Sequence, residues 1–343
     1  MTANNASEKV ITMAQGSGGL AMQALIDALF LSAFDNPWLG EREDGARLSL
    51  ADLSAQGDRL AFTTDSYVID PIFFPGGNIG KLAVCGTAND LVVSGATPTY
   101  LSCGFILEEG LPLSDLQRIV SSMAQTAREA GIAIVTGDTK VVQRGAADKI
   151  FINTAGIGAI PTAVRWGAGT IQPGDKIIVS GTLGDHGAAI LNLRERLGMD
   201  LGVESDCAVL ASLVAPLREV SGVHALRDAT RGGVNAILHE FGQASGCGMA
   251  IDESALPVKP AVRGICELLG LEALNFANEG KLVLAVSAGD EERVLNLLRA
   301  HPLGRDAATI GEATVDPQVC LRGALGISRQ LMLPWAEPLP RIC

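Results

Sequence analysis

Residues 79–96, IGKLAVCGTANDLVVSGA, have the spacing of a helix and are apolar or small at nearly every position. A helix that is apolar all round is stable only where other elements enclose it. The one carboxylate of this stretch, Asp90, is costly to bury unless a cation or several hydrogen-bond donors meet it. The stretch therefore predicts a buried helix in a layered protein, with a polar site beside Asp90.

The length of 343 residues exceeds what one ordinary core holds and favours two domains. Hydrophobic residues make up 48% of the chain and charged residues 19%, so both domains can bury a core. Helical and strand patterns alternate through both halves, which predicts an α/β (α+β) protein. Further helices are expected over 20–30, 114–131, 186–197, 232–244 and 290–300, and strands over 58–68, 132–139, 149–160 and 171–181. The predicted domains are 1–165 and 166–333, followed by a mobile tail, 334–343.

Charge and cysteine content exclude several classes of protein. The net charge of −12 provides no basic surface for nucleic acid. The seven cysteines include no C-x-x-C pair, and the histidines lack the spacing of a zinc site. No apolar run approaches the ~20 residues of a membrane span, and the first residues lack a signal-peptide core. We expect a cytoplasmic, reduced protein that contacts neither membrane nor nucleic acid.

The glycine loop QGSGG, residues 15–19, directly precedes a predicted helix. Glycines at such a position let main-chain N–H groups approach a phosphate at the positive end of the helix dipole. The loop is neither a dinucleotide fingerprint nor a Walker A motif. By itself it fits a plain surface loop as well as a phosphate site.

Four aspartates stand in polar turns or on the apolar helix: Asp65, Asp90, Asp138 and Asp228. Each alone is more often a capping or turn residue. Together, in an acidic and glycine-rich chain, they favour a site for Mg²⁺ and a nucleotide, because Mg²⁺ takes a few carboxylates together with phosphate oxygens. Arg231, in the turn before the predicted helix 232–244, could hold phosphate.

Single residues add weaker signals. Lys140 lies two residues after Asp138, and Glu279 stands just ahead of a predicted strand; either alone is more often a surface charge. His186 could be catalytic, although a histidine at a helix start is usually structural. Cys343 ends a proline-rich segment that reaches at most ~35 Å when extended, so the terminal thiol could carry a group into a nucleotide site on this same protein.

Seven motifs together resemble one family over essentially the whole chain. They are GSGG (16–19), TTDSYVIDPIFFPGGNIGKLAVCGTANDL (63–91), FILEEGLPLSDL (105–116), VTGDTKVVQRG (135–145), LRDATRGGVNAILHEFG (226–242), NEGKLV (278–283) and the final PRIC (340–343). They are similar to HypE, the carbamoyl dehydratases of [NiFe]-hydrogenase maturation. Single motifs are shared with the wider superfamily of aminoimidazole ribonucleotide synthetase, selenophosphate synthetase and thiamine-monophosphate kinase. Family members often have His before GSGG, where this chain has Gln15.

The resemblance implies a two-domain fold whose N-terminal domains pair into a dimeric β-barrel, with ATP near that interface. It implies that Cys343 accepts a carbamoyl group from the carbamoyltransferase HypF. ATP and Mg²⁺ then serve its dehydration to a thiocyanate, and the cyanide passes to iron on the HypC–HypD complex.

The residues expected to carry this chemistry fall into three sets. The catalytic set is Cys343, Lys140, Glu279 and Asp90. The ATP-binding set is Gly16, Ser17, Gly18, Gly19, Asp65, Lys81, Asn89, Asp138 and Arg231. The metal set is Asp65, Asp90, Asp138 and Asp228.

Two other classes of function stay open. One is a different ATP-dependent phosphoryl-transfer enzyme of the superfamily, which would not need the terminal cysteine. The other is a non-catalytic thiol carrier that uses ATP only as a switch. ATP hydrolysis by carbamoylated protein, with mass analysis of the C-terminal peptide, separates them.

Overall fold

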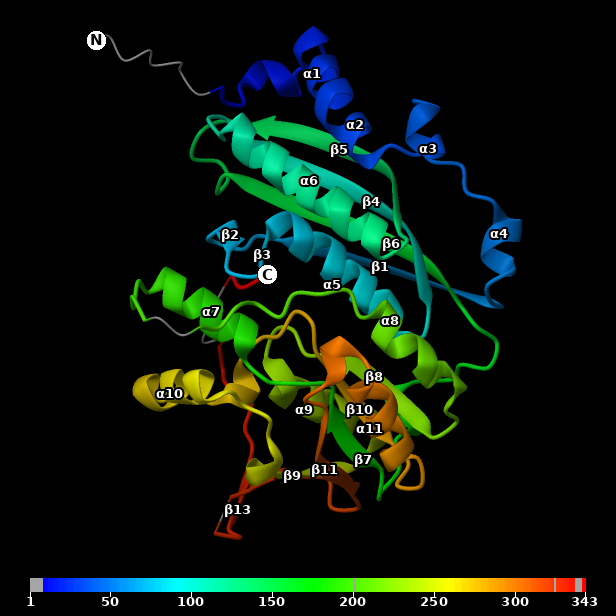
Figure 1. Ribbon diagram of the computed structural model, residues 1–343, viewed down its shortest axis with the longest axis vertical. Helices are drawn as coiled ribbons and strands as arrows, with labels where there is room; N and C mark the ends of the chain where they lie inside the picture. Colours follow the sequence, from blue (N-terminus) through cyan, green and yellow to red (C-terminus); the bar gives the residue numbers. More distant parts are fainter. Residues whose placement is uncertain (1–8, 200–201, 324, 337–340) are drawn as a thin grey trace.

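The structure is a computed structural model and describes residues 9–199, 202–323, 325–336 and 341–343. Two α/β halves lie one above the other in Figure 1, and helix α5 lies between them. The first half spans the four-stranded sheet and the second half the seven-stranded sheet. The first sheet ends at Ile160 and the second begins at Lys176, and the predicted boundary near residue 165 falls in this interval.

The N-terminal half contains a sheet of strand order β1-β6-β4-β5, in which only β4 and β5 are parallel. Its strands are β1 (Arg59–Tyr67), β2 (Phe73–Phe74), β3 (Gly77–Asn78), β4 (Thr97–Glu108), β5 (Ala133–Val142) and β6 (Ile150–Ile160). Its helices are η1 (Met13–Gly16), α1 (Leu20–Leu25), the π-helix η2 (Ile26–Leu31), α2 (Ser32–Phe34), α3 (Pro37–Gly40), α4 (Leu50–Ser54), α5 (Ile79–Val93) and α6 (Leu113–Glu129).

The C-terminal half contains a sheet of order β13-β12-β9-β11-β7-β10-β8. Its strands are β7 (Lys176–Val179), β8 (Val223–Asp228), β9 (Gly248–Asp252), β10 (Leu282–Val286), β11 (Ala308–Thr314), β12 (Val319–Arg322) and β13 (Ser328–Gln330). Its helices are η3 (Ala168–Thr170), α7 (Asp185–Arg194), α8 (Ala211–Val214), η4 (Ala215–Glu219), α9 (Gly233–Ser245), η5 (Glu253–Ala255), α10 (Pro260–Leu269), η6 (Ala273–Asn275), α11 (Glu291–Arg299) and η7 (Pro302–Gly304).

Helix α5 is buried as its composition predicts. The side chain of Asn78 caps it by accepting hydrogen bonds from the N–H groups of Gly80 and Lys81. The helix lies on β1 and β6, and its remaining sides meet α6, α8 and β8. At Gly86 a Cβ atom would collide with the Tyr67 hydroxyl, so only glycine allows this close approach to β1.

The two faces of the four-stranded sheet differ. Thr63, Asp65 and Tyr67 of β1 face α5, and the alternating residues of β1 lie on the opposite, outer face. That outer face exposes three large apolar side chains: Leu60 at 54%, Phe62 at 71% and Ile106 at 42%. Large apolar side chains exposed on one sheet face are typical of an interaction surface.

The end of the chain differs from the prediction. An exposed, mobile tail was expected over 334–343, but Ile342 is 1% exposed and Cys343 is 9% exposed. Both belong to the same apolar core as Tyr67 and Phe74. The N–H of Val68 donates to the main-chain oxygen of Cys343 at 3.0 Å, so the last residues are docked just beyond the end of β1. Figure 1 shows the chain end beside β2, β3 and α5. Residues 337–340 of the predicted tail lie outside the described part.

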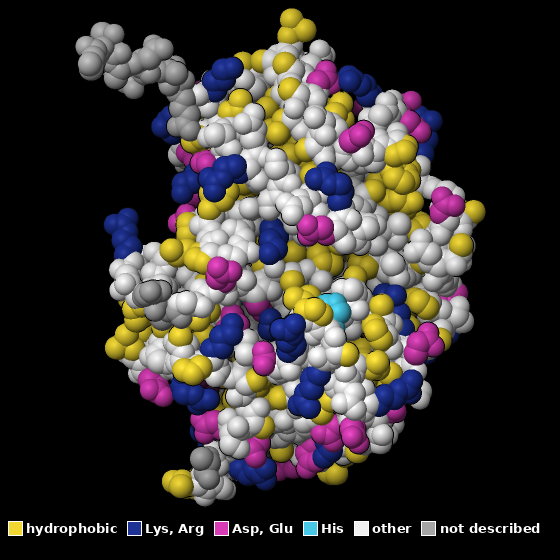
Figure 2. All heavy atoms as spheres, viewed as in Figure 1, with side chains coloured by type: hydrophobic (Ala, Val, Ile, Leu, Met, Phe, Trp, Pro, Cys, Tyr) yellow, Lys and Arg dark blue, Asp and Glu magenta, His cyan; other side chains and the backbone are white. Residues whose placement is uncertain are grey.

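Most of the predicted elements are present. The helices over 79–96, 186–197, 232–244 and 290–300 correspond to α5, α7, α9 and α11. The helix predicted over 20–30 is interrupted, because α1 passes into the π-helix η2 at Ile26. None of the described helices is long and apolar enough to cross a membrane. On the face shown in Figure 2, basic and acidic side chains alternate without a continuous basic stripe.

Candidate active site

Four carboxylates approach one another where the two halves meet, and we call them the acid cluster: Asp65 of β1, Asp90 of α5, Asp228 at the end of β8, and Glu279 before β10. The Thr63 hydroxyl donates to Asp90 Oδ2 at 2.8 Å, and the N–H of Ser66 donates to Asp65 Oδ1 at 2.7 Å. Each half contributes two members. The cluster therefore forms only when the halves are packed together.

The acid cluster is electrostatically strained. Burial raises the pKa of Asp90, and the neighbouring Asp65 raises it further. Burial, with the charges of Asp90 and Asp65, raises the pKa of Asp228 to about 7. Like charges held together in this way favour a proton or a cation among them.

Glu279 is the most enclosed member of the acid cluster. Its residue is 3% exposed, and its Oε1 has no hydrogen-bond partner within the described part of the chain. Burial raises the pKa of Glu279 well above its usual range, and Cys207 and Asp206 act in the same direction. A buried carboxyl oxygen without a partner is expensive to keep and is characteristic of a site that receives a ligand.

A buried ion pair that the sequence analysis missed holds the Glu279 loop. Asp206 Oδ2 lies 3.2 Å from Lys281 Nζ, and its Oδ1 accepts the N–H of Glu279 at 3.0 Å. Burial opposes the charge on Asp206, but Lys281 and the N–H of Glu279 keep the pKa of Asp206 below its usual value. The one available signal was Lys281, a cation directly before a strand that is apolar throughout.

Asp138 and Lys140 do not join the acid cluster within one protomer, contrary to the expectation that all these residues share a site. They form an exposed ion pair of 2.7 Å on the edge strand β5. Asp138 aligns with Gly104, then Asn153, then Ser66 across the sheet, a separation of roughly 14 Å at ~4.8 Å per strand. Both side chains lie on the exposed face, whereas Asp65 faces α5.

The glycine loop also lies at the β5 edge. Segment η1 packs on β5, and Gly16 lies so close to Val141 that a Cβ atom would collide with that side chain. Ser17 and Gly18 follow, and Gly19 is the N-cap residue of α1. The side chain of Gln15 accepts from the N–H and hydroxyl of Thr12 at 2.8 and 2.7 Å, so it closes the turn. The residues predicted to bind ATP phosphates therefore lie at two opposite edges of the four-stranded sheet in one protomer, the glycine loop and Asp138 at β5 and Asp65 at β1.

Three residues predicted to bind ATP belong neither to the acid cluster nor to the β5 edge. Asn89 Nδ2 donates to Ala208 O at 3.0 Å, and its Oδ1 accepts the N–H of Leu210 at 2.9 Å, so it joins α5 to the C-terminal half. Lys81 Nζ donates to Gly76 O at 2.9 Å. Arg231 is exposed in the turn before α9. Their contact with ATP stays a prediction.

The acid cluster fits a cation that is shared with a ligand rather than caged by protein. Among the described residues, no three His, Cys, Asp or Glu side chains are close enough to hold a metal ion by themselves. Mg²⁺ typically takes one or two carboxylates and completes its octahedron with phosphate oxygens and water. The mutually repelling Asp65, Asp90 and Asp228 suit this arrangement.

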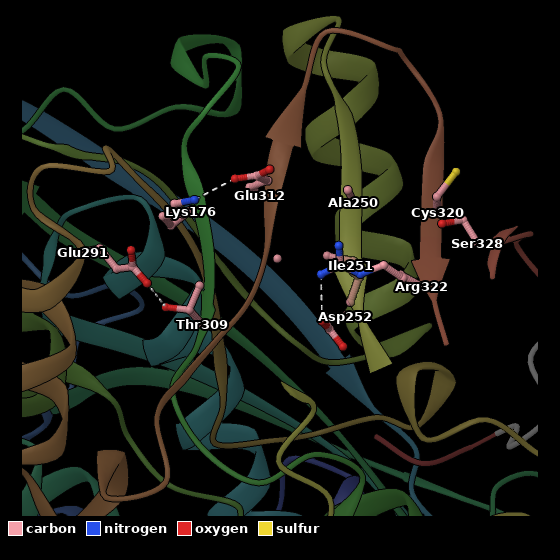
Figure 3. A pocket seen from close by; sticks show the side chains of 11 residues that line it. Lys176, Ala250, Ile251, Asp252, Glu291, Thr309, Glu312, Cys320, Arg322 and Ser328 are labelled. Atoms are coloured by element: carbon pink, nitrogen blue, oxygen red, sulfur yellow. Dashed lines mark hydrogen bonds and ion pairs between the residues drawn. The ribbon is translucent and has the colours of Figure 1, made fainter. Parts of the chain in front are cut away.

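The cavity shown in Figure 3 is a different place, on the seven-stranded sheet, with a volume of ≈ 350 Å³. Four of its charged residues form ion pairs, Lys176 with Glu312 at 2.6 Å and Arg322 with Asp252 at 2.8 Å, and Glu291 accepts a hydrogen bond from the Thr309 hydroxyl at 2.6 Å. Paired groups at a solvent-open surface have ordinary reactivity. The chemistry is therefore concentrated at the acid cluster.

His186, at the start of α7, is completely buried and contacts the docked chain end. Its Nε2 lies 2.6 Å from the main-chain oxygen of Ile342, and its Nδ1 lies 2.8 Å from Ser205 Oγ. The ring packs edge-on against Phe74 with centroids 5.6 Å apart. Cys343 follows Ile342, and its main-chain oxygen is held by Val68, three residues after Asp65.

The fold and this site define the class of protein. The family model for the N-terminal domain of AIR synthase related proteins matches residues 42–160, and that for the C-terminal domain matches residues 172–322. The chain is therefore a member of the AIR synthase related proteins. Within that class, it is 69% identical to the carbamoyl dehydratase HypE of Escherichia coli strain K12 over 97% of this chain and 99% of that protein. The chain belongs to the HypE family of carbamoyl dehydratases.

Two solved structures of the family carry further information. One is a hydrogenase maturation protein HypE in complex with ATP, 48% identical, with a TM-score of 0.90 over 97% of this chain and 99% of that one. The other is a HypE–HypF complex, 44% identical, with a TM-score of 0.79 over 91% of this chain and 100% of that one.

Proposed function

We propose that this protein uses ATP to dehydrate a carbamoyl group carried on Cys343, giving a thiocyanate. The observation that carries the proposal is the docking of Cys343 against Val68. Three residues of extended strand span ~10 Å, so the thiol-bearing end lies about that far along β1 from Asp65. A cysteine that ends a chain and is docked about 10 Å from a member of the acid cluster suits delivery of a thiol-bound substrate.

The reaction converts S–C(=O)–NH₂ into S–C≡N. The amide oxygen attacks the γ-phosphoryl group, which forms an O–P bond and breaks the bond to ADP. Two N–H protons leave, and the C–O bond breaks as phosphate departs. This path makes a good leaving group from an amide oxygen, which is a poor one, and it requires a base beside the nitrogen.

Glu279 fits the role of the residue that orients the amide and takes its proton. Its unpartnered Oε1 can accept an N–H hydrogen bond, and its raised pKa makes the carboxylate a stronger base than an exposed one. Asp90, fixed by the Thr63 hydroxyl, fits a supporting role on the metal side.

Mg²⁺ would be held by one or two carboxylates from the set Asp65, Asp90 and Asp228, together with ATP oxygens, and it would supply charge neutralisation at the transferring phosphoryl group. The chain's own contribution is the rigid placement of these carboxylates on β1, α5 and β8. Asp138 in the metal set then requires a second protomer.

We propose a homodimer that completes the site. The exposed apolar face of the four-stranded sheet, with Leu60, Phe62 and Ile106, is the surface for the second copy. Asp138 and Lys140 lie on that same face. Dimerisation would bring Lys140 of the partner subunit, with the partner's glycine loop, toward the acid cluster of the first.

Two partners follow from the same chemistry. The carbamoyl group must come from a carbamoyltransferase, and the complex of a relative with HypF supports HypF as the donor. Delivery of cyanide breaks the S–C bond, returns the Cys343 thiolate and consumes two electrons, so the acceptor must supply them; we propose the iron-carrying HypC–HypD complex as that acceptor.

The test follows the mass of the C-terminal peptide. Carbamoylated protein given Mg-ATP is expected to lose the mass of one water on the peptide that ends in Cys343, with ADP and phosphate released. Cys343→Ala should accept no carbamoyl group. ATP hydrolysis without loss of water would instead support a thiol carrier with an ATP switch.

A further inference from the structure

The contacts of His186 fix which ring nitrogen carries its proton. The main-chain oxygen of Ile342 can only accept, so the Nε2 that lies 2.6 Å away carries the hydrogen. Nδ1 then accepts from the hydroxyl of Ser205, 2.8 Å away, which in turn accepts the N–H of Cys207 at 3.2 Å. A chain of three hydrogen bonds thus points a fixed donor at the end of the polypeptide.

The surroundings keep this imidazole neutral. Burial lowers the pKa of His186, although Asp206 and the Ile342 carbonyl act in the opposite direction. The Asp206 charge is itself neutralised by Lys281 at 3.2 Å. The group that donates to the Ile342 carbonyl is therefore the N–H of a neutral, buried imidazole.

Beside the 3.0 Å hydrogen bond from the N–H of Val68 to the main-chain oxygen of Cys343, the docked end has contacts through Arg341 that are less enclosed than the one with His186. Arg341 donates to Val68 O at 3.2 Å and pairs with Asp148 at 2.5 Å, but its side chain is 36% exposed and that of Asp148 is 59% exposed. Exposed ion pairs of this kind contribute little. Arg341 also has φ +61°, an unfavourable conformation for a residue with a side chain. The docked geometry needs a stronger contact to offset that cost.

We propose that His186 is a positioning residue that anchors the C-terminal arm through the Ile342 carbonyl and so holds the Cys343 end in its docked position, about 10 Å from Asp65, during dehydration. The proposal rests on the proposed function, because it assigns the arm's docked position to the dehydration step. Carbamoyl transfer takes place on the partner enzyme, so loading needs the arm released, whereas dehydration needs it docked. His186 therefore acts on one step and not on the other.

The first experiment measures docking without any enzyme assay. Iodoacetamide is added to the intact protein, and alkylation of the Cys343 peptide is followed by mass spectrometry. In His186→Phe the ring volume is kept but the donor is lost, and a buried carbonyl without a donor favours release of the arm by roughly 5- to 100-fold. Alkylation of Cys343 should accelerate to that extent.

Two variants test the donor rather than the packing. His186→Gln keeps an N–H₂ group at the end of the side chain and should retain most of the protection of Cys343. Ser205→Ala leaves the ring in place but removes the partner that fixes its tautomer, so it should give an intermediate rate. The matched control is His239→Phe, since His239 bonds only within α9, to Asn235 O at 2.9 Å, in the contacts described. It should alkylate like the wild type.

The second experiment separates the two steps. Carbamoyl loading by HypF should proceed in His186→Phe at the wild-type rate or faster, while kcat for water loss falls at least ~10-fold and KM for ATP stays unchanged. If alkylation of Cys343 in His186→Phe and Ser205→Ala matches the wild type, the anchor is wrong. If docking weakens as expected but wild-type protein never loses water, the proposed function is wrong and the anchor stands. Should His186→Phe fail to fold, Ser205→Ala decides by the same measurement.

Discussion

Asp206 and Lys281 form a buried ion pair, 3.2 Å between Oδ2 and Nζ, with side chains only 3% and 10% exposed. The same carboxylate accepts the N–H groups of Glu279 and Gly280 at 3.0 and 3.3 Å. The pair therefore fixes the loop that carries Glu279. The charge of Asp206 also adds to the burial that raises the pKa of that glutamate.

The pair should be essential for stability. Lys281→Met leaves Asp206 charged and unpaired in the interior, which costs on the order of 3–5 kcal/mol of unfolding free energy. Urea unfolding followed by circular dichroism measures the loss. The control is Lys176→Met, which breaks the exposed 2.6 Å pair with Glu312 and should cost less than about 1 kcal/mol. Equal losses in the two variants would contradict the role given to burial.

Glu279→Gln should stop dehydration without stopping transfer of the carbamoyl group to Cys343. The amide side chain fills the same volume but cannot take a proton, so kcat for water loss should fall by roughly 100- to 10,000-fold. Carbamoyl transfer to Cys343 and ATP affinity should both remain near wild type. Loading and water loss are read from the same C-terminal peptide by mass. A variant that dehydrates normally would remove Glu279 from the reaction.

Mixing two inactive variants tests whether the site is shared between subunits. In a Lys140→Ala homodimer both sites lack the lysine, and in a Glu279→Gln homodimer both sites lack the glutamate. A mixed dimer contains one site with both wild-type residues, so mixing should restore on the order of a quarter of wild-type activity after subunit exchange. The double variant Lys140→Ala/Glu279→Gln mixed with Lys140→Ala is the control and should restore none. No recovery in the first mixture, with exchange verified, would contradict a site shared between subunits.

Phe62→Asp should disrupt the proposed dimer. Phe62 is 71% exposed on the outer face of the edge strand β1, where a charge buried in a dimer interface would be strongly unfavourable. Sedimentation should show a shift from dimer toward monomer, with the free energy of unfolding of the monomer little changed. Leu325→Asp is the control, because Leu325 is 90% exposed in the C-terminal half. An unaltered dimer in Phe62→Asp would move the interface elsewhere.

Asp228 should make stability depend on pH. Its pKa of about 7 in the folded protein lies above the usual 3.8. The contribution of the protonated carboxyl to the free energy of unfolding is therefore complete below pH 3.8 and is lost as the pH rises toward 7. The free energy of unfolding of Asp228→Asn should match that of the wild type at pH 4. At pH 8 it should exceed the wild-type value by on the order of 1–2 kcal/mol, a figure reduced for the partial exposure of Asp228 to solvent. Urea unfolding at the two pH values measures this difference. Mg-ATP should reduce the difference between the two proteins at pH 8 by stabilising the wild type. A difference that stays constant across pH would contradict the link between Asp228 ionisation and stability.

The sequence alone was sufficient for whatever depends on local pattern. The all-round apolar character of 79–96 predicted a buried helix, and the periodicities predicted α7, α9 and α11. The motif set by itself indicated the family. The cost of burial indicated Asp90 on its apolar helix, polar turns in an acidic chain indicated Asp65 and Asp228, and only the resemblance indicated Glu279.

Tertiary structure decided which of these residues meet. Strand order separates Asp138 and Lys140 from the acid cluster, and no local pattern encodes the order β1-β6-β4-β5. Asp206 lies in a segment without periodicity, so its pairing with Lys281 across 75 residues could not be predicted. The docking of Ile342 on His186 spans 156 residues. Such contacts depend on how the two halves pack, since burial, rather than sequence spacing, selects the partner of each buried polar group.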